Sequence, residues 1–127
     1  MKPLLGIFTI LFTLIFSSAS FAEWTDVGRS VDGDTFYIDF ERIRENDDYV
    51  YYWELQSLSK PDTDGDFSYK WYYQGDCNLF RLKLLKGSYH KDPMGIGEGI
   101  DGSAPDKWEY PPPNSMWENS LNLVCSR

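Results

Sequence analysis

Aromatic residues alternate with other residues in two nearby stretches, and this pattern restricts the fold more than any other feature of the chain. Residues 67–73 carry, at odd positions, Phe67, Tyr69, Trp71 and Tyr73. Residues 49–58 carry, at odd positions, Tyr49, Tyr51, Trp53 and Leu55. A period of two with aromatic residues is typical of strands with one buried face. The linker 59–66 is rich in turn-forming residues, which predicts an antiparallel hairpin.

Shorter stretches predict further strands and one helix. After three consecutive prolines, Ser115 and Glu118 have the spacing of a capping box at a helix start. The helix would bury one stripe of side chains, formed by Trp117, Leu121, Val124 and Cys125. The overall prediction is an α+β fold with one antiparallel sheet of about six strands and a C-terminal helix. The additional strands are expected at residues 24–29, 35–38, 80–84 and 108–110.

The first 22 residues have the composition of a secretory signal peptide. Residues 4–16 are predominantly apolar, and small residues precede the expected cleavage point after Ala22. The apolar run is shorter than the roughly 20 residues that a membrane-spanning helix needs. No cysteine stands at the cleavage point, so no lipid attachment is expected there. We therefore expect residues 1–22 to be removed on export and residues 23–127 to form one domain.

The chain contains two cysteines, Cys77 and Cys125. In an oxidising compartment outside the cytoplasm, two thiols most often form one structural disulfide. Cys125 falls in the last turn of the predicted helix, so a bridge to Cys77 would attach this helix to the sheet. The alternative, a redox-active pair, normally has a C-x-x-C spacing that these cysteines lack.

The balance of charged residues restricts the class of partner. Removing the signal takes away one lysine and no acidic residue, which leaves 11 basic and 20 acidic residues and a net charge of −9. Nucleic acids and anionic membrane surfaces require basic patches. The charge therefore argues against both classes of partner, and after cleavage the sequence predicts no membrane span.

Three acidic residues in the hairpin linker, Asp62, Asp64 and Asp66, are the best candidate for a metal site, because Ca²⁺ prefers several oxygens from a tight turn. The loop departs from the EF-hand pattern, since its twelfth residue is Tyr73 rather than glutamate. An ordinary solvated loop is the favoured alternative. His90, the one histidine, is expected at the surface, and no nucleophile can be paired with it. We expect no enzymatic activity and no cofactor.

Aromatic residues make up 17% of the chain and occur on both faces of the predicted hairpin. One helix covers only one face of a sheet, so exposed rings are expected to form a binding face or a dimer interface. The alternative is that both faces are partly packed and that tyrosine hydroxyls reach water. The candidate binding residues are Tyr52, Tyr72, Trp53 and Trp71.

Several short segments occur in a characteristic order and spacing along the mature chain. They are residues 24–28, 33–39 and 42–44, the strand 50–55 with Trp53, Asp76-Cys77, Phe80-Arg81, residues 93–95, Trp108 with the prolines after it, and Val124-Cys125. In order and spacing these segments resemble the surface-adhesin protein E family. The resemblance implies a six-stranded antiparallel sheet with a C-terminal helix tied to its concave side by a disulfide. It also implies an adhesin that binds host matrix and plasma proteins and can form a dimer, although fold transfers better than function.

The leading interpretation is a non-enzymatic, adhesin-like binding module that contacts a protein through its aromatic sheet face or its loops. The partner would be a host or envelope protein, and a homodimer is a further option. One alternative is a soluble periplasmic protein that binds a small ligand or acts as an inhibitor. Another is a calcium-dependent envelope protein that uses the three aspartates at 62–66. The expected location is the periplasm or the cell surface of a bacterium.

Overall fold

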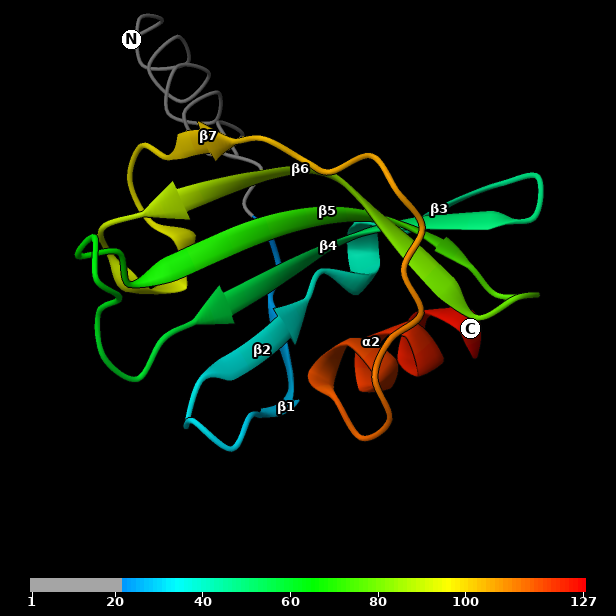
Figure 1. Ribbon diagram of the computed structural model, residues 1–127, viewed down its shortest axis with the longest axis horizontal. Coiled ribbons are helices and arrows are strands. Elements are labelled where there is room, and N and C mark those ends of the chain that lie inside the picture. The colour runs from blue at the N-terminus through cyan, green and yellow to red at the C-terminus, as the bar shows by residue number, and fades with distance from the viewer. Residues whose placement is uncertain (1–21) are drawn as a thin grey trace, which may run out of the picture.

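The computed structural model describes residues 22–127, so the predicted signal peptide lies almost entirely outside the described residues and stays a prediction. The described part of the chain forms one antiparallel sheet in the order β1-β2-β4-β5-β6-β7, and the short β3 also pairs with β4 (Figure 1). No helix in residues 22–127 is long and apolar enough to cross a bilayer. The elements are β1 (Thr25–Arg29), β2 (Thr35–Ile38), η3 (Phe40–Arg42), β3 (Arg44–Asn46), β4 (Tyr49–Ser57), β5 (Ser68–Asp76), β6 (Arg81–His90), η4 (Pro93–Gly95), β7 (Ile100–Gly102) and α2 (Met116–Cys125).

The central hairpin of β4 and β5 forms as predicted, and its register decides which rings are buried. Val50, Tyr52 and Glu54 of β4 are buried on the side of α2, whereas Tyr51 and Trp53 point away from α2. Leu55, on the same side as Trp53, is buried where η4 packs on the strand. Each β4 residue pairs with a β5 residue of opposite parity, such as Tyr52 with Tyr73 and Trp53 with Tyr72. Odd positions of the two strands therefore lie on opposite faces of the sheet, and the alternation within one strand does not tell which of its rings are buried.

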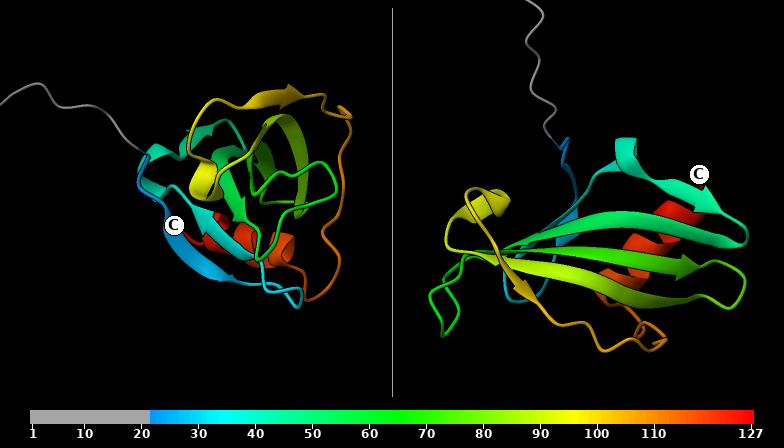
Figure 2. Two further views of the ribbon diagram at one scale, coloured as in Figure 1. Left: turned by 90° about the vertical axis from the view of Figure 1, so that its left-hand side faces the viewer. Right: turned by 90° about the horizontal axis from the view of Figure 1, so that it is seen from above.

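Helix α2 packs on the concave side of the sheet, as Figure 2 shows from two directions. Its Leu121 and Val124 are buried in the core with residues of β2, β4 and β5. Close approach is allowed by Gly75, because a Cβ atom there would lie 2.9 Å from a Leu121 methyl group. The predicted cap is present, since the Ser115 hydroxyl accepts from the Glu118 backbone N–H at 3.2 Å. The core of the molecule therefore lies between α2 and one face of the sheet.

The predicted helical stripe is wrong at Trp117, which is 43% exposed. The buried positions of α2 are instead Ser120, Leu121 and Val124. Trp117 lies in the first turn of the helix and lines hollows beside the edge segment that contains Glu109. The large ring is therefore half-exposed at the margin of the core rather than inside it.

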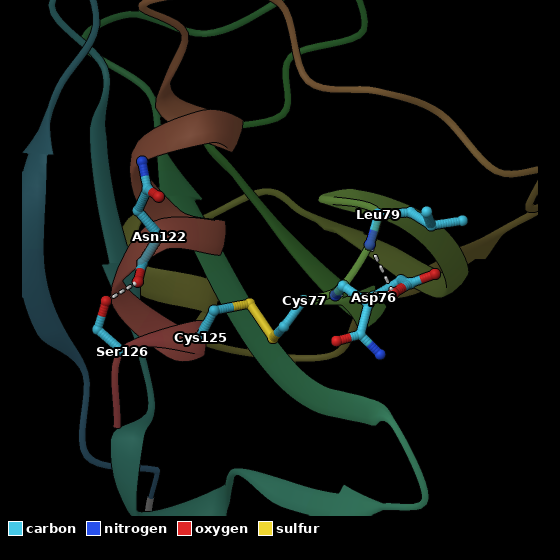
Figure 3. The surroundings of a disulfide bond; sticks show 7 residues. Asp76, Cys77, Leu79, Asn122, Cys125 and Ser126 are labelled. Carbon is cyan, nitrogen blue, oxygen red and sulfur yellow. Dashed lines mark hydrogen bonds between the residues drawn. A yellow bond between two sulfur atoms is a disulfide. The ribbon is translucent and has the colours of Figure 1, made fainter.

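The predicted disulfide joins Cys77, in the turn after β5, to Cys125 in the last turn of α2 (Figure 3), with the Cα atoms 5.6 Å apart. The turn is stabilised by Asp76, whose carboxylate accepts from the backbone N–H groups of Asn78 and Leu79. The same carboxylate pairs with the Arg81 Nε at 3.0 Å. The helix is thereby attached to a turn that is itself well braced.

One end of the face opposite α2 is covered by η4. The Ser68 hydroxyl donates to the Asp92 carbonyl and accepts from the Gly95 N–H, which fixes η4 over β5. His90 lies beneath the chain that follows and is only 4% exposed, so its predicted surface position is wrong. The close packing explains this burial, because a Cβ atom at Gly99 would lie 2.5 Å from the His90 ring. In residues 22–127 the α-helix lies on the other face, so no α-helix of this part of the chain covers the rest of the face.

Candidate binding face

The sheet face turned away from α2 carries a cluster of aromatic and basic side chains. Strand pairing places Lys86, Tyr72 and Trp53 in one row across β6, β5 and β4. Arg44 and Tyr51 are paired in the adjacent row, across β3 and β4. Side chains two residues apart along a strand point to the same side, so both rows project from one surface. We call the surface formed by Arg44, Tyr51, Trp53, Tyr72 and Lys86 the open face.

The rings of the open face contact one another closely. The ring centroids of Trp53 and Tyr72 are 4.8 Å apart with an interplanar angle of 35°. Those of Tyr51 and Tyr72 are 6.4 Å apart and nearly parallel at 28°. Neighbouring rings on a regular sheet have few alternative rotamers, so this aromatic surface is preformed.

Two cations lie over these rings. The Lys86 Nζ is 5.3 Å from the Trp53 ring centroid and 5.4 Å from that of Tyr72. The Arg44 Nη2 donates to the Tyr72 hydroxyl at 3.2 Å, and its guanidinium carbon lies 5.8 Å from the Tyr51 ring centroid. Such cation–π contacts contribute about 0.5–1 kcal/mol each at exposed sites. The positive charges are therefore positioned beside the rings while still in contact with solvent.

A second group of the same chemistry lies near the turn between β5 and β6. The Trp108 ring packs 5.4 Å from the Tyr49 ring, measured between centroids. The Arg81 guanidinium carbon and the Lys83 Nζ lie 4.4 Å and 4.8 Å from the centroid of the same indole. Tyr49 and Lys83 have the strand positions that face the same way as Tyr51. Aromatic rings with adjacent cations therefore continue along this side of the sheet.

The structure divides the four predicted binding residues between the two sides of the sheet. Trp53 and Tyr72 lie together on the open face, half-buried among their neighbours. Tyr52 is 1% exposed and packs against Tyr73 beneath α2, so it is a core residue and cannot contact a partner. Trp71 points to the helix side, where its ring lies 5.8 Å from that of Tyr89.

The helix side has a hollow of its own. Its volume is about 190 Å³, and its lining includes Gln56, Trp71, Tyr73, Leu84 and Trp117. The segment 105–109 forms one wall. The hollow is mostly apolar and is too small for a folded partner, so its dimensions suit only a small molecule.

Glu54 is an acidic side chain inside the core, on the same side as α2. It is 0% exposed, and neither carboxylate oxygen forms a hydrogen bond of normal geometry among the described residues. Burial raises the pKa of Glu54 from 4.5 to about 8, and the Ser120 hydroxyl on α2 opposes this rise weakly. Glu54 is therefore protonated near neutral pH and buried as a neutral group.

The three aspartates of the predicted calcium loop lie together, with one oxygen of each within 4.8 Å of the others. Protein groups already contact these oxygens. The Tyr69 hydroxyl donates to Asp62 at 2.6 Å, and the Lys91 ammonium lies 3.0 Å from an oxygen of Asp66. The Tyr69 hydrogen bond and the backbone N–H of Asp66 hold the pKa of Asp62 below its usual value. The cluster is thus neutralised in part by the chain itself.

Sequence reasoning missed three members of the open face. Tyr51, Arg44 and Lys86 were not singled out as candidate binding residues. Lys86 is an even-numbered residue like Leu82 and Leu84, which face α2, so regular alternation would place it on the helix side. The pairing of β6 with β5, however, shifts between Tyr72 and Tyr73. The shift leaves one extra residue in β6, a β-bulge that turns Lys86 to the opposite side. A break in the alternation of apolar residues after Leu84 is the one signal in the sequence.

The fold and the disulfide define a class of small domains in which one helix is tied to the concave side of an antiparallel sheet. The sequence profile of surface-adhesin protein E matches residues 24–126, and the chain belongs to this family. The family places the chain among adhesin-like surface proteins. No curated protein matches the sequence.

Solved structures of Haemophilus influenzae protein E share the fold. Crystal form II is 15% identical, with a TM-score of 0.66 over 85% of this chain and 91% of that one. The selenomethionine form is 14% identical, with a TM-score of 0.65 over 85% and 89%. A structure from non-typeable H. influenzae is 14% identical, with a TM-score of 0.59 over 87% and 79%. At these identities the likeness concerns the fold alone.

Proposed function

We propose that this chain is a non-enzymatic, exported binding module that contacts a protein partner through the open face. The observation that carries the proposal is the preformed cluster of Tyr51, Trp53 and Tyr72 with Arg44 and Lys86 beside it. Tryptophan, tyrosine and arginine are the residue types most enriched at the centres of protein interfaces. Family membership supports a role in adhesion, and the partner would be a host or envelope protein.

The rigidity of the open face favours binding. Its rings are half-buried on the central strands β4 and β5, which pair over nine residues each. Side chains already fixed in one rotamer lose little conformational entropy when a partner covers them. The face can therefore form an interface without rearrangement of the sheet.

The first test of this proposal is attachment of cells that export the full chain. Protease added to intact cells should cleave the mature protein, and these cells should attach to surfaces coated with extracellular-matrix proteins. The double variant Trp53→Ala/Tyr72→Ala should reduce attachment at least about tenfold, because interface centres of this kind dominate binding free energy. Export and the melting midpoint of each variant are measured in parallel.

Tyr110→Ala is the matched control, since Tyr110 is 65% exposed on the segment that leads to α2 and lies outside the open face. This variant should attach as the wild type does. Equal attachment by the double variant would reject the open face as the binding surface. Full protection of the chain in the periplasm would reject surface adhesion and leave a periplasmic partner.

A second candidate function rests on the helix-side hollow. The largely apolar lining that includes Trp71 and Trp117 suits a small apolar ligand, in keeping with a periplasmic ligand-binding protein. Quenching or a blue shift of tryptophan fluorescence with small apolar compounds, abolished by Trp71→Ala and retained in Trp53→Ala, would support this function instead. A fluorescence spectrum unchanged by such compounds would reject it.

A further inference from the structure

We propose that the open face binds an acidic segment of its protein partner, with Lys86 and Arg44 pairing with aspartate or glutamate carboxylates. This inference rests on the proposed function, because it names the chemistry of the partner at the same surface. Its basis is the placement of two cations beside the rings in a chain whose net charge is otherwise strongly negative.

The charges of the molecule are unevenly distributed. The whole chain has 20 acidic and 12 basic residues, yet Lys86 and Arg44 lie against the rings of the open face. Trp53 also lines a hollow with Arg42, Lys70 and Asp39, and Asp39 is buried. Among the described residues, neither Lys86 nor Arg44 forms a salt bridge. The cations beside Trp108 differ, because Arg81 pairs with Asp76 and Lys83 lies 3.7 Å from Asp106. An acidic partner would be repelled by most of the surface and attracted at the open face.

Lys86 is placed on this face by a local irregularity rather than by regular alternation. The β-bulge in β6 turns Lys86 toward Tyr72 and Trp53, while Leu84 just before it faces α2. Bulges often re-aim a side chain at a functional surface. Without the extra residue, Lys86 would point to the helix side, and the aromatic cluster would lack this ammonium group.

The two cations retain donors for an incoming anion. An aromatic ring attracts the Lys86 ammonium but accepts no conventional hydrogen bond, so the three N–H groups stay available. Arg44 uses one nitrogen for the Tyr72 hydroxyl and has further N–H groups in its planar fork. Carboxylates form charge-assisted hydrogen bonds with such donors, and Arg44 can bind one in a bidentate manner. The adjacent rings reduce access of water and strengthen the pairing.

The two cations extend from opposite sides of the β4–β5 hairpin, because Arg44 lies on β3 and Lys86 on β6. Their charged groups both reach Tyr72, Arg44 at its hydroxyl and Lys86 over its ring. An extended acidic segment that crosses the strands would place one carboxylate at each cation, with its other side chains over Trp53 and Tyr51. An acidic polypeptide thus uses both the charges and the rings.

The test uses the purified mature chain and a synthetic peptide in which glutamate alternates with threonine. Binding is followed by tryptophan fluorescence and calorimetry, and a peptide with glutamine in place of glutamate is the comparison. The glutamate peptide should bind at least about tenfold more tightly than the glutamine peptide. Lys86→Glu and Arg44→Glu should each weaken it by about tenfold or more, because a like charge then faces the carboxylates.

Lys60→Glu is the matched control, because it makes the same charge change on an exposed lysine of the loop between β4 and β5. It should alter affinity less than about twofold, since exposed charges farther than about 8 Å apart are largely screened at physiological salt. Equal loss in Lys60→Glu would overturn the inference, because it would indicate a general charge effect. Equal binding of the two peptides, or no binding of the glutamate peptide up to about 1 mM, would also overturn it.

The cell attachment assay separates failure of this inference from failure of the proposed function. If Trp53→Ala/Tyr72→Ala abolishes attachment while Lys86→Glu leaves it unchanged, the open face binds a partner that is not acidic, and the inference is overturned alone. If neither set of variants changes attachment, the proposed function fails as well. Tighter binding of heparin than of the glutamate peptide, lost in Lys86→Glu, would overturn the acidic-segment inference in favour of an anionic glycan.

Discussion

The two faces of the central hairpin use the same residue types for different purposes. On the side of α2, Tyr52 and Tyr73 are buried with their rings 5.5 Å apart. On the other side, Trp53 and Tyr72 are 4.8 Å apart and reach solvent beside two cations. Tyr52 and Trp53 are adjacent in sequence, so the period of two alone assigns one ring to the core and the next to the surface. Aromatic content thus becomes informative only when the face of each residue is known.

The largest effect we expect concerns the helix side, where Glu54 is buried. Below about pH 4.5 Glu54 is protonated in both the folded and the unfolded chain, and above about pH 8 it is ionised in both. Between these values the unfolded chain loses the proton first, so the free energy of unfolding falls as the pH rises. Across this whole pH interval the free energy of unfolding decreases by on the order of 5 kcal/mol, because each unit of pKa difference corresponds to about 1.4 kcal/mol.

Glu54→Gln tests this expectation by urea unfolding at a mildly acidic and a mildly alkaline pH. The variant should resemble the wild type in acid and be more stable than the wild type in alkali. The difference between the two proteins isolates Glu54 from other titrating groups, including Asp62 and Asp76, whose pKa values are lowered. An equal difference in unfolding free energy between the two proteins at both pH values would contradict the raised pKa of Glu54.

The disulfide should have the next largest effect. The double variant Cys77→Ser/Cys125→Ser should lose about 4 kcal/mol of unfolding free energy, because the bridge closes a long loop in the unfolded chain. Chemical denaturation measures this loss. The open face lies away from α2, so peptide binding by the still-folded fraction should change little. If the loss of the bridge instead abolished binding by folded protein, the two faces would not be independent.

A matched pair of adjacent substitutions compares the two faces directly. Tyr52→Ala should lower the unfolding free energy by about 3 kcal/mol, as expected for a large buried side chain. Trp53→Ala should cost about 1 kcal/mol, because its ring is only partly buried. Thermal or urea unfolding of both variants gives the comparison. Equal costs would mean that the open face is also part of the core.

The smallest expected effect is that of calcium. Lys91 and Tyr69 already contact the carboxylates of Asp66 and Asp62, so calcium should leave the melting midpoint as it is in chelator. A ligand that binds the folded state must raise this midpoint. A clear rise with calcium, lost in Asp64→Asn, would therefore establish the calcium-dependent alternative.

Regular periodicity made most of the fold predictable. The hairpin of β4 and β5, the strand at 35–38 and the helix after the prolines all follow from local patterns, and all are present. The disulfide was predictable as well, because an exported chain with two cysteines has one intramolecular pairing available. These features depend on short-range sequence or on a simple count.

The composition of the open face was much less predictable. Which ring of β4 is buried depends on the register across the hairpin, and the position of Lys86 depends on a bulge in β6. Arg44 joins the face only because β3 pairs with β4. Each of these features depends on how two strands pair, and the pairing cannot be deduced from the sequence of one segment. The burial of His90 was missed for the same reason, because a later segment folds over it.

The most direct test of the account compares Trp53→Ala with Trp71→Ala, two tryptophans on neighbouring strands that point to opposite sides of one sheet. Attachment to extracellular-matrix protein is measured for cells that display equal amounts of each folded variant. We predict that Trp53→Ala reduces attachment about tenfold or more and that Trp71→Ala stays within about twofold of the wild type. Loss of attachment in Trp71→Ala, with Trp53→Ala unaffected, would contradict the account and place binding on the helix side.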